Sequence, residues 1–169
     1  MNDFTLPPRP LPEVEEVLMF DVDAISALKE KVEALPGYMR FSNEQIDMIY
    51  CVAHSIFMQG KVESACSIFQ TLLIYRPLDI RILTAFGLCC KQLGMFEQSI
   101  PALTCAYLLD SEDVKLAVHI AECLAALGKY EQSSQILDPL LHLTEVDASL
   151  ANIQKRAGAL KHMLSERSA

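Results

Sequence analysis

The segments QGKVESA (59–65), LGMFEQS (93–99) and LGKYEQS (127–133) decide the fold of this chain, because they are three copies of one pattern. Each has glycine at its second position, and 34 residues separate Gly60 from Gly94 and Gly94 from Gly128. Seven positions before each glycine lies a small residue, two positions after it a large apolar one, and at the next position a glutamate. A period of this length indicates a repeat architecture.

Each unit is predicted to be a pair of antiparallel helices. Small residues such as Ala53, Gly87 and Ala121 let the helix backbones approach closely, and the glycine turns the chain between the helices. The pattern resembles the tetratricopeptide repeat, with Pro77 where that family usually ends its second helix. The fold class expected is therefore an all-α tetratricopeptide-repeat superhelix, with first helices near 46–59, 80–93 and 114–127 and second helices near 63–75, 97–109 and 131–138.

Four regions are expected along the chain. They are a flexible proline-rich N-terminus (1–12), an N-terminal helical region (13–37), three repeats within 46–140 (about 46–79, 80–113 and 114–145) and a C-terminal capping helix (147–166). The apolar stripe of the second region either covers the open end of the repeat stack or forms a dimer interface; it comprises Ile25, Leu28, Val32 and Leu35. The stripe of the last helix is expected to cover the final repeat; it comprises Leu150, Ile153, Ala157, Leu160 and Leu164.

Two prolines are expected to disturb the repeats. Pro101 falls early in the second helix of the second unit, where it removes a hydrogen bond and should kink or delay that helix. Pro139 should shorten the second helix of the third unit, and a turn is expected near Thr144 to Asp147.

Composition excludes several classes of protein. The chain is 51% hydrophobic and only 21% charged, which favours a folded protein over a disordered one. Its 14 basic and 22 acidic residues give a net charge of −8, so nucleic acid is not an expected partner. The start MNDFTLPPRPLP fits no signal or transit peptide, and no apolar run approaches the roughly 20 residues that span a bilayer. A cytoplasmic protein that does not insert into membranes is expected.

No residue pattern indicates catalysis, a metal or a cofactor. The chain has no glycine-rich phosphate loop and no nucleophile elbow, so we expect no enzyme activity. The pairs His119 with Cys123 and Cys51 with His54 share helix faces, but four ligands at a recognised spacing are not present. The six cysteines are interpreted as small buried hydrophobic residues; they are Cys51, Cys66, Cys89, Cys90, Cys105 and Cys123.

A peptide-binding groove is the functional feature predicted from the helix pattern. The first helix of each pair lines the inner surface of such a superhelix, and the residues between its packing positions should face the groove. Tyr50, His54 and Phe57 form an apolar strip suited to an extended peptide, unless Tyr50 and Phe57 pack as ordinary core against the N-terminal helices. The remaining predicted groove residues are Thr84, Leu88 and Lys91 in the second unit and Val118, Glu122 and Ala125 in the third.

A closer resemblance is carried by IYCVAHSIFMQGKVESACSIFQTL (49–72), DIRILTAFGLCCKQLGMFEQSI (79–100) and HIAECLAALGKYEQS (119–133). These runs resemble the tetratricopeptide-repeat chaperones of bacterial type III secretion that serve the pore-forming translocator proteins. The resemblance implies that the groove binds a short extended segment of a translocator. The family's groove residues match Tyr50, His54, Phe57, Val62, Tyr75 and Leu103.

The function expected is therefore that of a bacterial, ATP-independent chaperone that keeps a hydrophobic translocator soluble before export. A homodimer through the N-terminal helices is a further expected partnership. The residues leave two alternatives open: a chaperone or regulator for another secretion component, such as a needle or filament subunit, and a generic peptide-binding scaffold.

Overall fold

The structure is a computed structural model that describes residues 31, 34, 41–146 and 150–168. Expectations for residues 1–12 and 13–37 therefore lie outside the described residues, apart from positions 31 and 34. The described elements are all helices, which confirms the all-α class: α3 (Asn43–Met58), α4 (Val62–Tyr75), α5 (Ile80–Gln92), α6 (Phe96–Leu109), α7 (Val114–Ala126), α8 (Tyr130–Val146) and α9 (Ala151–Ser168).

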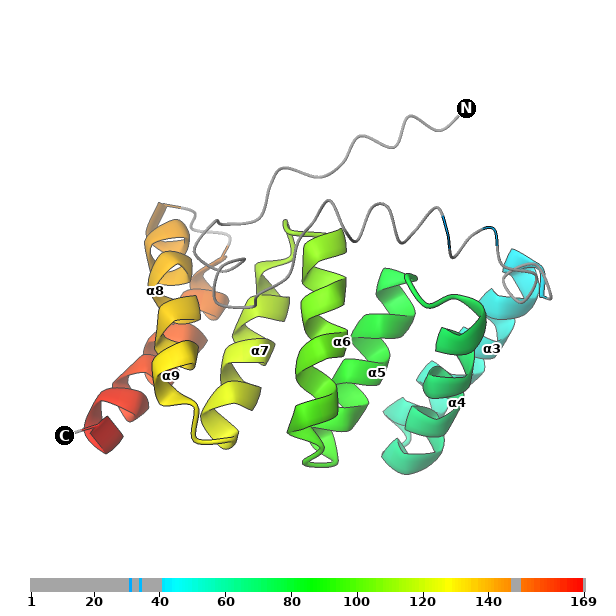
Figure 1. Ribbon diagram of the computed structural model, residues 1–169, viewed down its shortest axis with the longest axis horizontal. Coiled ribbons are helices and arrows are strands. Elements are labelled where there is room, and N and C mark those ends of the chain that lie inside the picture. The colour runs from blue at the N-terminus through cyan, green and yellow to red at the C-terminus, as the bar shows by residue number, and fades with distance from the viewer. Residues whose placement is uncertain (1–30, 32–33, 35–40, 147–149, 169) are drawn as a thin grey trace.

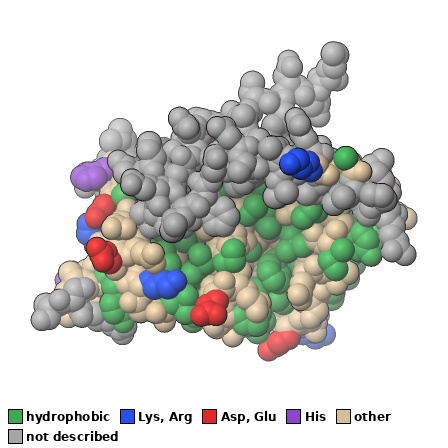
Figure 2. Space-filling model, viewed as in Figure 1, with side chains coloured by type: hydrophobic (Ala, Val, Ile, Leu, Met, Phe, Trp, Pro, Cys, Tyr) green, Lys and Arg blue, Asp and Glu red, His purple; other side chains and the backbone are tan. Residues whose placement is uncertain are grey.

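The helices stand side by side in one row, with α3 and α4 at one end and α9 at the other (Figure 1). Each helix packs against the next one along the chain, and α7 also contacts both α5 and α9. This is the tetratricopeptide-repeat-like arrangement expected. On the face seen in Figure 2, hydrophobic side chains gather over the middle of the row, whereas charged ones lie mainly toward its lower edge and its α8–α9 end.

The three repeated glycines end the first helix of each pair. Gly60, Gly94 and Gly128 have φ angles of +79°, +75° and +76°, a region that residues with a Cβ adopt only under strain. The backbone N–H of Gly60 donates to the Phe57 carbonyl at 2.8 Å, and that of Lys61 to the Ile56 carbonyl at 3.2 Å. The same two bonds recur at the other two glycines, so each turn satisfies the last free carbonyls of its helix.

Small residues hold the paired helices close together. Ser99 donates from Oγ to the carbonyl of Gly87 at 2.7 Å, and Ser133, 34 residues later, donates to that of Ala121 at 2.8 Å. A Cβ added at Gly87 would lie 2.7 Å from both Cγ and Cδ2 of the buried Leu103. Helices α5 and α6 can therefore pack this closely only because Gly87 has no side chain.

The start of α3 has a capping box. Ser42 Oγ accepts from the Gln45 backbone N–H at 3.3 Å, and Gln45 Oε1 accepts from the Ser42 N–H at 2.9 Å. Arg76, buried at the end of α4, donates to the Phe41 carbonyl at 2.8 Å. The Arg76 bond ties the chain entering α3 to the second helix of its own pair.

The delay expected at Pro101 and the shortening expected at Pro139 are wrong. Helix α6 begins at Phe96 and continues through Pro101, and α8 continues through Pro139 to Val146 instead of ending before it. A proline removes one backbone hydrogen bond, whereas burial of Ile136, Leu137 and Leu140, each 0% exposed, stabilises α8 on both sides of Pro139. The turn predicted near Thr144 to Asp147 does not begin at Thr144. Helix α8 continues to Val146, so the prediction is wrong as far as that residue.

The two ends of the described row differ. At the α9 end, Ala157, Leu160 and Leu164 are buried, as the predicted capping stripe requires. At the other end, Met48 and Val52 on α3 are 63% and 58% exposed. Ile82 and Leu116 occupy the position of Met48 in the second and third repeats, 34 and 68 residues later. Both are almost fully buried, because each packs against the preceding helix pair.

Candidate peptide-binding groove

A cavity of about 360 Å³ opens between α3 and α5. Five residues predicted to face the groove line it together: Tyr50, His54, Phe57, Thr84 and Leu88. Three of them come from successive turns of α3 and two from α5, the first helices of neighbouring pairs. The remaining lining residues were not predicted; they are Phe69, Ile80, Arg81, Ala85 and Asp113.

The aromatic wall of the cavity is held by ring contacts. The Tyr50 ring stacks on His54 with centroids 6.1 Å apart and lies 5.6 Å from the ring of Phe69, which is 1% exposed. Burial raises the pKa of the Tyr50 phenol, because the phenolate is poorly solvated there. Tyr50 is therefore a neutral ring that contacts Phe69 of the core and also lines the cavity.

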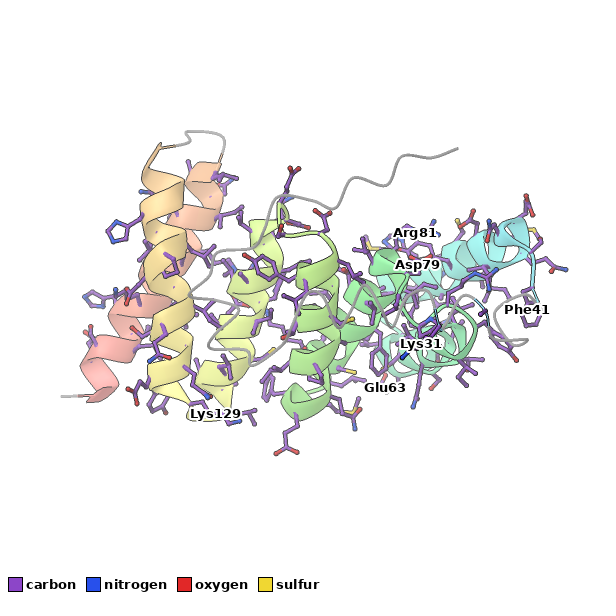
Figure 3. The ribbon with its side chains drawn as sticks, turned by 45° about the horizontal axis from the view of Figure 1, so that its top comes forward. Lys31, Phe41, Glu63, Asp79, Arg81 and Lys129 are labelled. Atoms are coloured by element: carbon purple, nitrogen blue, oxygen red, sulfur yellow. The ribbon has the colours of Figure 1, made fainter. Side chains whose placement is uncertain are left out.

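Arg81 forms the charged rim of the cavity. Its guanidinium lies 5.4 Å from the centroid of the Tyr50 ring and pairs with Asp47 on α3 and Asp79 before α5, each at 2.9 Å. Figure 3 shows Arg81 and Asp79 beside each other near the start of α5. These hydrogen bonds to two carboxylates raise the pKa of Arg81. Sequence reasoning missed Arg81, although the cap signal at Asp79 two residues earlier locates it at the start of α5.

Several predicted groove residues lie elsewhere. Val62, Leu103 and Val118 are 6%, 0% and 1% exposed and belong to the packed core, so they do not line the cavity. They stand at large apolar positions whose side chains fill the space between helices. Tyr75 packs edge-on against Phe41, with ring centroids 4.7 Å apart, and it too is outside the cavity lining.

Lys91 and Glu122 belong to a second group of side chains, which we call the charged cluster: Lys91 on α5, His119 and Glu122 on α7, and Arg156 on α9. Lys91 pairs with Glu122, and Arg156 donates to Glu122 from Nε at 2.5 Å and from its terminal nitrogen at 2.7 Å. Burial of Glu122 opposes its ionisation, but hydrogen bonds from His119, Arg156 and Lys91 hold the pKa of its carboxyl at about 2. Sequence reasoning did not identify His119 or Arg156 as partners.

Four of the six cysteines are core residues, Cys105 is half-buried and Cys51 lies at the surface. Cys66, Cys89, Cys90 and Cys123 are buried and free, whereas Cys51 is exposed, so its expected burial is wrong. Burial raises the pKa of the Cys89 and Cys90 thiols to about 12, which keeps them protonated and unreactive at neutral pH. Among the residues that the structure describes, no three His, Cys, Asp or Glu side chains gather as a metal site would require.

No helix in the described part of the chain is both long and apolar enough to cross a membrane. The chain matches no protein-family model. Among curated proteins it is 25% identical over 92 residues to the low calcium response locus protein H of Yersinia pestis and of Yersinia pseudotuberculosis. That match covers 54% of this chain and only 55% of each relative, about half of its length.

Solved structures match over a larger share of the chain. PcrH of Pseudomonas aeruginosa, bound to the chaperone-binding region of PopB, is 25% identical, with a TM-score of 0.63 over 72% of this chain and 98% of PcrH. The PcrH complex with the equivalent region of PopD gives 24% identity and a TM-score of 0.69 over 77% and 98% of the two chains. The chain resembles translocator chaperones.

A third structure is the type III secretion chaperone SycD of Yersinia enterocolitica with a peptide of the translocator YopD. It is 20% identical and has a TM-score of 0.69 over 77% of this chain and 99% of SycD. SycD has also been crystallised as an alternative dimer. These findings confirm the resemblance predicted from the repeat sequences and the fold that it implied.

Proposed function

We propose that this protein is a type III secretion chaperone that holds an extended segment of a secreted translocator and keeps that client soluble before export. The observation that carries the proposal is the cavity between α3 and α5, where Tyr50, His54, Phe57, Thr84 and Leu88 meet. The similarity to PcrH and SycD, which were crystallised with translocator segments, supports this client class.

The physical basis of such a chaperone is capture of apolar surface. A translocator carries membrane-inserting segments that aggregate in water, and binding part of the client lowers its free concentration. An aromatic wall with half-buried rings can hold an apolar side chain of the client, and burying such a side chain contributes about 2 kcal/mol. This action requires neither nucleotide nor catalysis, and it places the protein in the bacterial cytoplasm, where the client is made.

The test is co-expression with the secreted proteins encoded beside this chain, followed by affinity purification. Joint replacement of Tyr50 and Phe57 by alanine should weaken capture of the translocator at least about 30-fold, because truncating buried aromatic anchors typically costs 2 kcal/mol or more. The matched control is Ile74→Ala, which shortens an apolar side chain that is 72% exposed on α4 and does not line the cavity.

Tyr50 also packs on Phe69, so its replacement could reduce capture by weakening the fold. A second variant separates loss of binding from loss of folding. Thr84→Glu leaves both rings in place and puts a carboxylate into the apolar cavity, so it should also abolish capture while the circular dichroism spectrum stays unchanged. Unchanged capture by both variants would overturn the proposal. Recovery of a needle or filament subunit instead of a translocator would change the client and keep the groove.

Self-association is the second partnership that we propose. Met48 and Val52 are exposed on α3, whereas Ile82, which corresponds to Met48 in the next pair, is buried, so this face of the first pair offers apolar area to a second copy. The dimer of SycD supports self-association as such, whereas the dimer expected through the N-terminal helices falls outside the described residues. Light scattering should give twice the chain mass for the protein and a single mass for Val52→Glu.

A further inference from the structure

The charged cluster lies directly beside the cavity on the same row of helices. Leu88 lines the cavity, and Lys91 follows it by one turn of α5 on the same helix face. Residues three apart on a helix surface are about 5 to 6 Å apart, so the cluster begins one side-chain width beyond the cavity wall. The helix α7, which carries His119 and Glu122, contacts α5 on one side and α9 on the other.

The charges within the cluster do not balance. Lys91 and Arg156 contribute two positive charges and Glu122 one negative charge. His119 Nδ1 lies among these groups, 2.8 Å from Lys91 Nζ and 3.1 Å from an Arg156 terminal nitrogen. Even without any charge on His119, the charges of Lys91, Arg156 and Glu122 sum to one positive charge, in a chain whose net charge is −8.

Hydrogen-bond donors in the cluster remain available. Arg156 uses Nε and one terminal nitrogen for Glu122 and His119, and within the described residues no bond is recorded for its other terminal nitrogen. Lys91 carries three N–H groups, donates to Glu122 and has His119 Nδ1 as its other neighbour in the cluster. The Arg156 side chain is 46% exposed and that of Lys91 is 22% exposed, so an incoming group can reach these donors.

We propose that Lys91 and Arg156 bind a carboxylate side chain of the client, two or three residues away from the apolar residue that enters the cavity. An extended peptide advances about 3.3 Å per residue. Two or three residues therefore cover the distance from the cavity wall at Leu88 to the charged cluster at Lys91. Excess positive charge and free donors match a carboxylate. The inference rests on the proposed function, because it assigns the chemistry of the client segment held in the same groove.

Glu122 has two roles in this arrangement. It keeps the two cations in place when the groove is empty, and it lowers the positive charge that the client carboxylate meets. Removing its charge by Glu122→Gln should therefore strengthen binding of an acidic client segment, whereas Arg156→Gln should weaken it. A purely structural cluster predicts the same direction for both substitutions.

The probes are overlapping 15-residue peptides of the secreted proteins encoded beside this chain, measured by fluorescence anisotropy with the full chain. Each bound peptide is compared with a copy in which Glu becomes Gln and Asp becomes Asn. The protein should bind the neutral copy about fivefold more weakly, the size expected of one partly exposed charge pair. Arg156→Gln should remove that difference, and the matched control Lys155→Gln, an exposed neighbour on α9, should keep it.

The outcomes separate the two proposals. If no peptide binds the protein, the proposed function fails and this inference fails with it. If peptides bind but carry no acidic residue, or if acidic and neutral copies bind equally, the proposed function stands and the carboxylate site is wrong. Equal weakening of both copies by Arg156→Gln would show that Arg156 only supports the fold, and would also overturn the inference.

Discussion

Gly87 sets the distance between α5 and α6, and the same substitution at two glycines tests this directly. A methyl group at Gly87 would lie 2.7 Å from two carbons of Leu103, which is 0% exposed and cannot move into solvent. Such overpacking costs about 1 to 3 kcal/mol, whereas replacing a helical glycine by alanine gains about 1 kcal/mol. Gly87→Ala should therefore lower the free energy of unfolding by about 1 kcal/mol.

Gly158 on α9 is the matched control, because a Cβ there would meet only Leu141 Cδ2 at 4.0 Å, an ordinary contact. Gly158→Ala should raise the free energy of unfolding by up to about 1 kcal/mol. The same chemical change thus has opposite signs at the two sites. Urea denaturation followed by circular dichroism measures both.

A double-mutant cycle identifies Leu103 as the cause. Leu103→Ala alone should cost about 2 to 5 kcal/mol through the cavity it leaves. In the presence of Gly87→Ala that cost should fall by about 1 kcal/mol or more, because the new methyl group occupies part of the space. Additive effects, or stabilisation by Gly87→Ala, would refute the claim that contact with Leu103 limits the approach of these helices.

Two further predictions follow from local contacts. Ser42→Ala should lower the free energy of unfolding by about 1 kcal/mol, as loss of a helix cap does, and Thr71→Ala on the exposed face of α4 should change it much less. The pKa of Glu122 is depressed from 4.5 to about 2, so its charge contributes stability above pH 4.5 that disappears as the pH falls toward 2. The difference in unfolding free energy between the protein and Glu122→Gln should therefore shrink over that interval, and a constant difference would contradict it.

The repeat period predicted the fold because a helix pair is specified locally. The left-handed turns at Gly60, Gly94 and Gly128 and the close contact at Gly87 depend on residues within one period, and the sequence places them in phase. The continuation of α8 past Pro139 was not predictable in this way. Its stability comes from burial against neighbouring helices, which local propensity does not include.

The candidate groove was predicted in part for the same reason. Helical spacing on α3 and α5 brings Tyr50 and Leu88 to one cavity, since both helices follow the period. Val118 has the same spacing on α7 but is buried, because spacing alone does not show how much of a helix its neighbours cover. The partnership of Glu122 with Arg156 depends on where α9 docks, and α9 lies outside the repeats.

The central claim is that the cavity between α3 and α5 holds a translocator segment, and photo-crosslinking tests it most directly. A benzophenone amino acid replaces Thr84 in the cavity or, as the control, the exposed Ile74 on α4, during co-expression with the translocator. Mass spectrometry of the crosslinked product then locates the contact. The account predicts crosslinks from position 84 to one short segment of the client and none from position 74. A complex that forms without crosslinks at position 84, or that crosslinks equally at both positions, would contradict it.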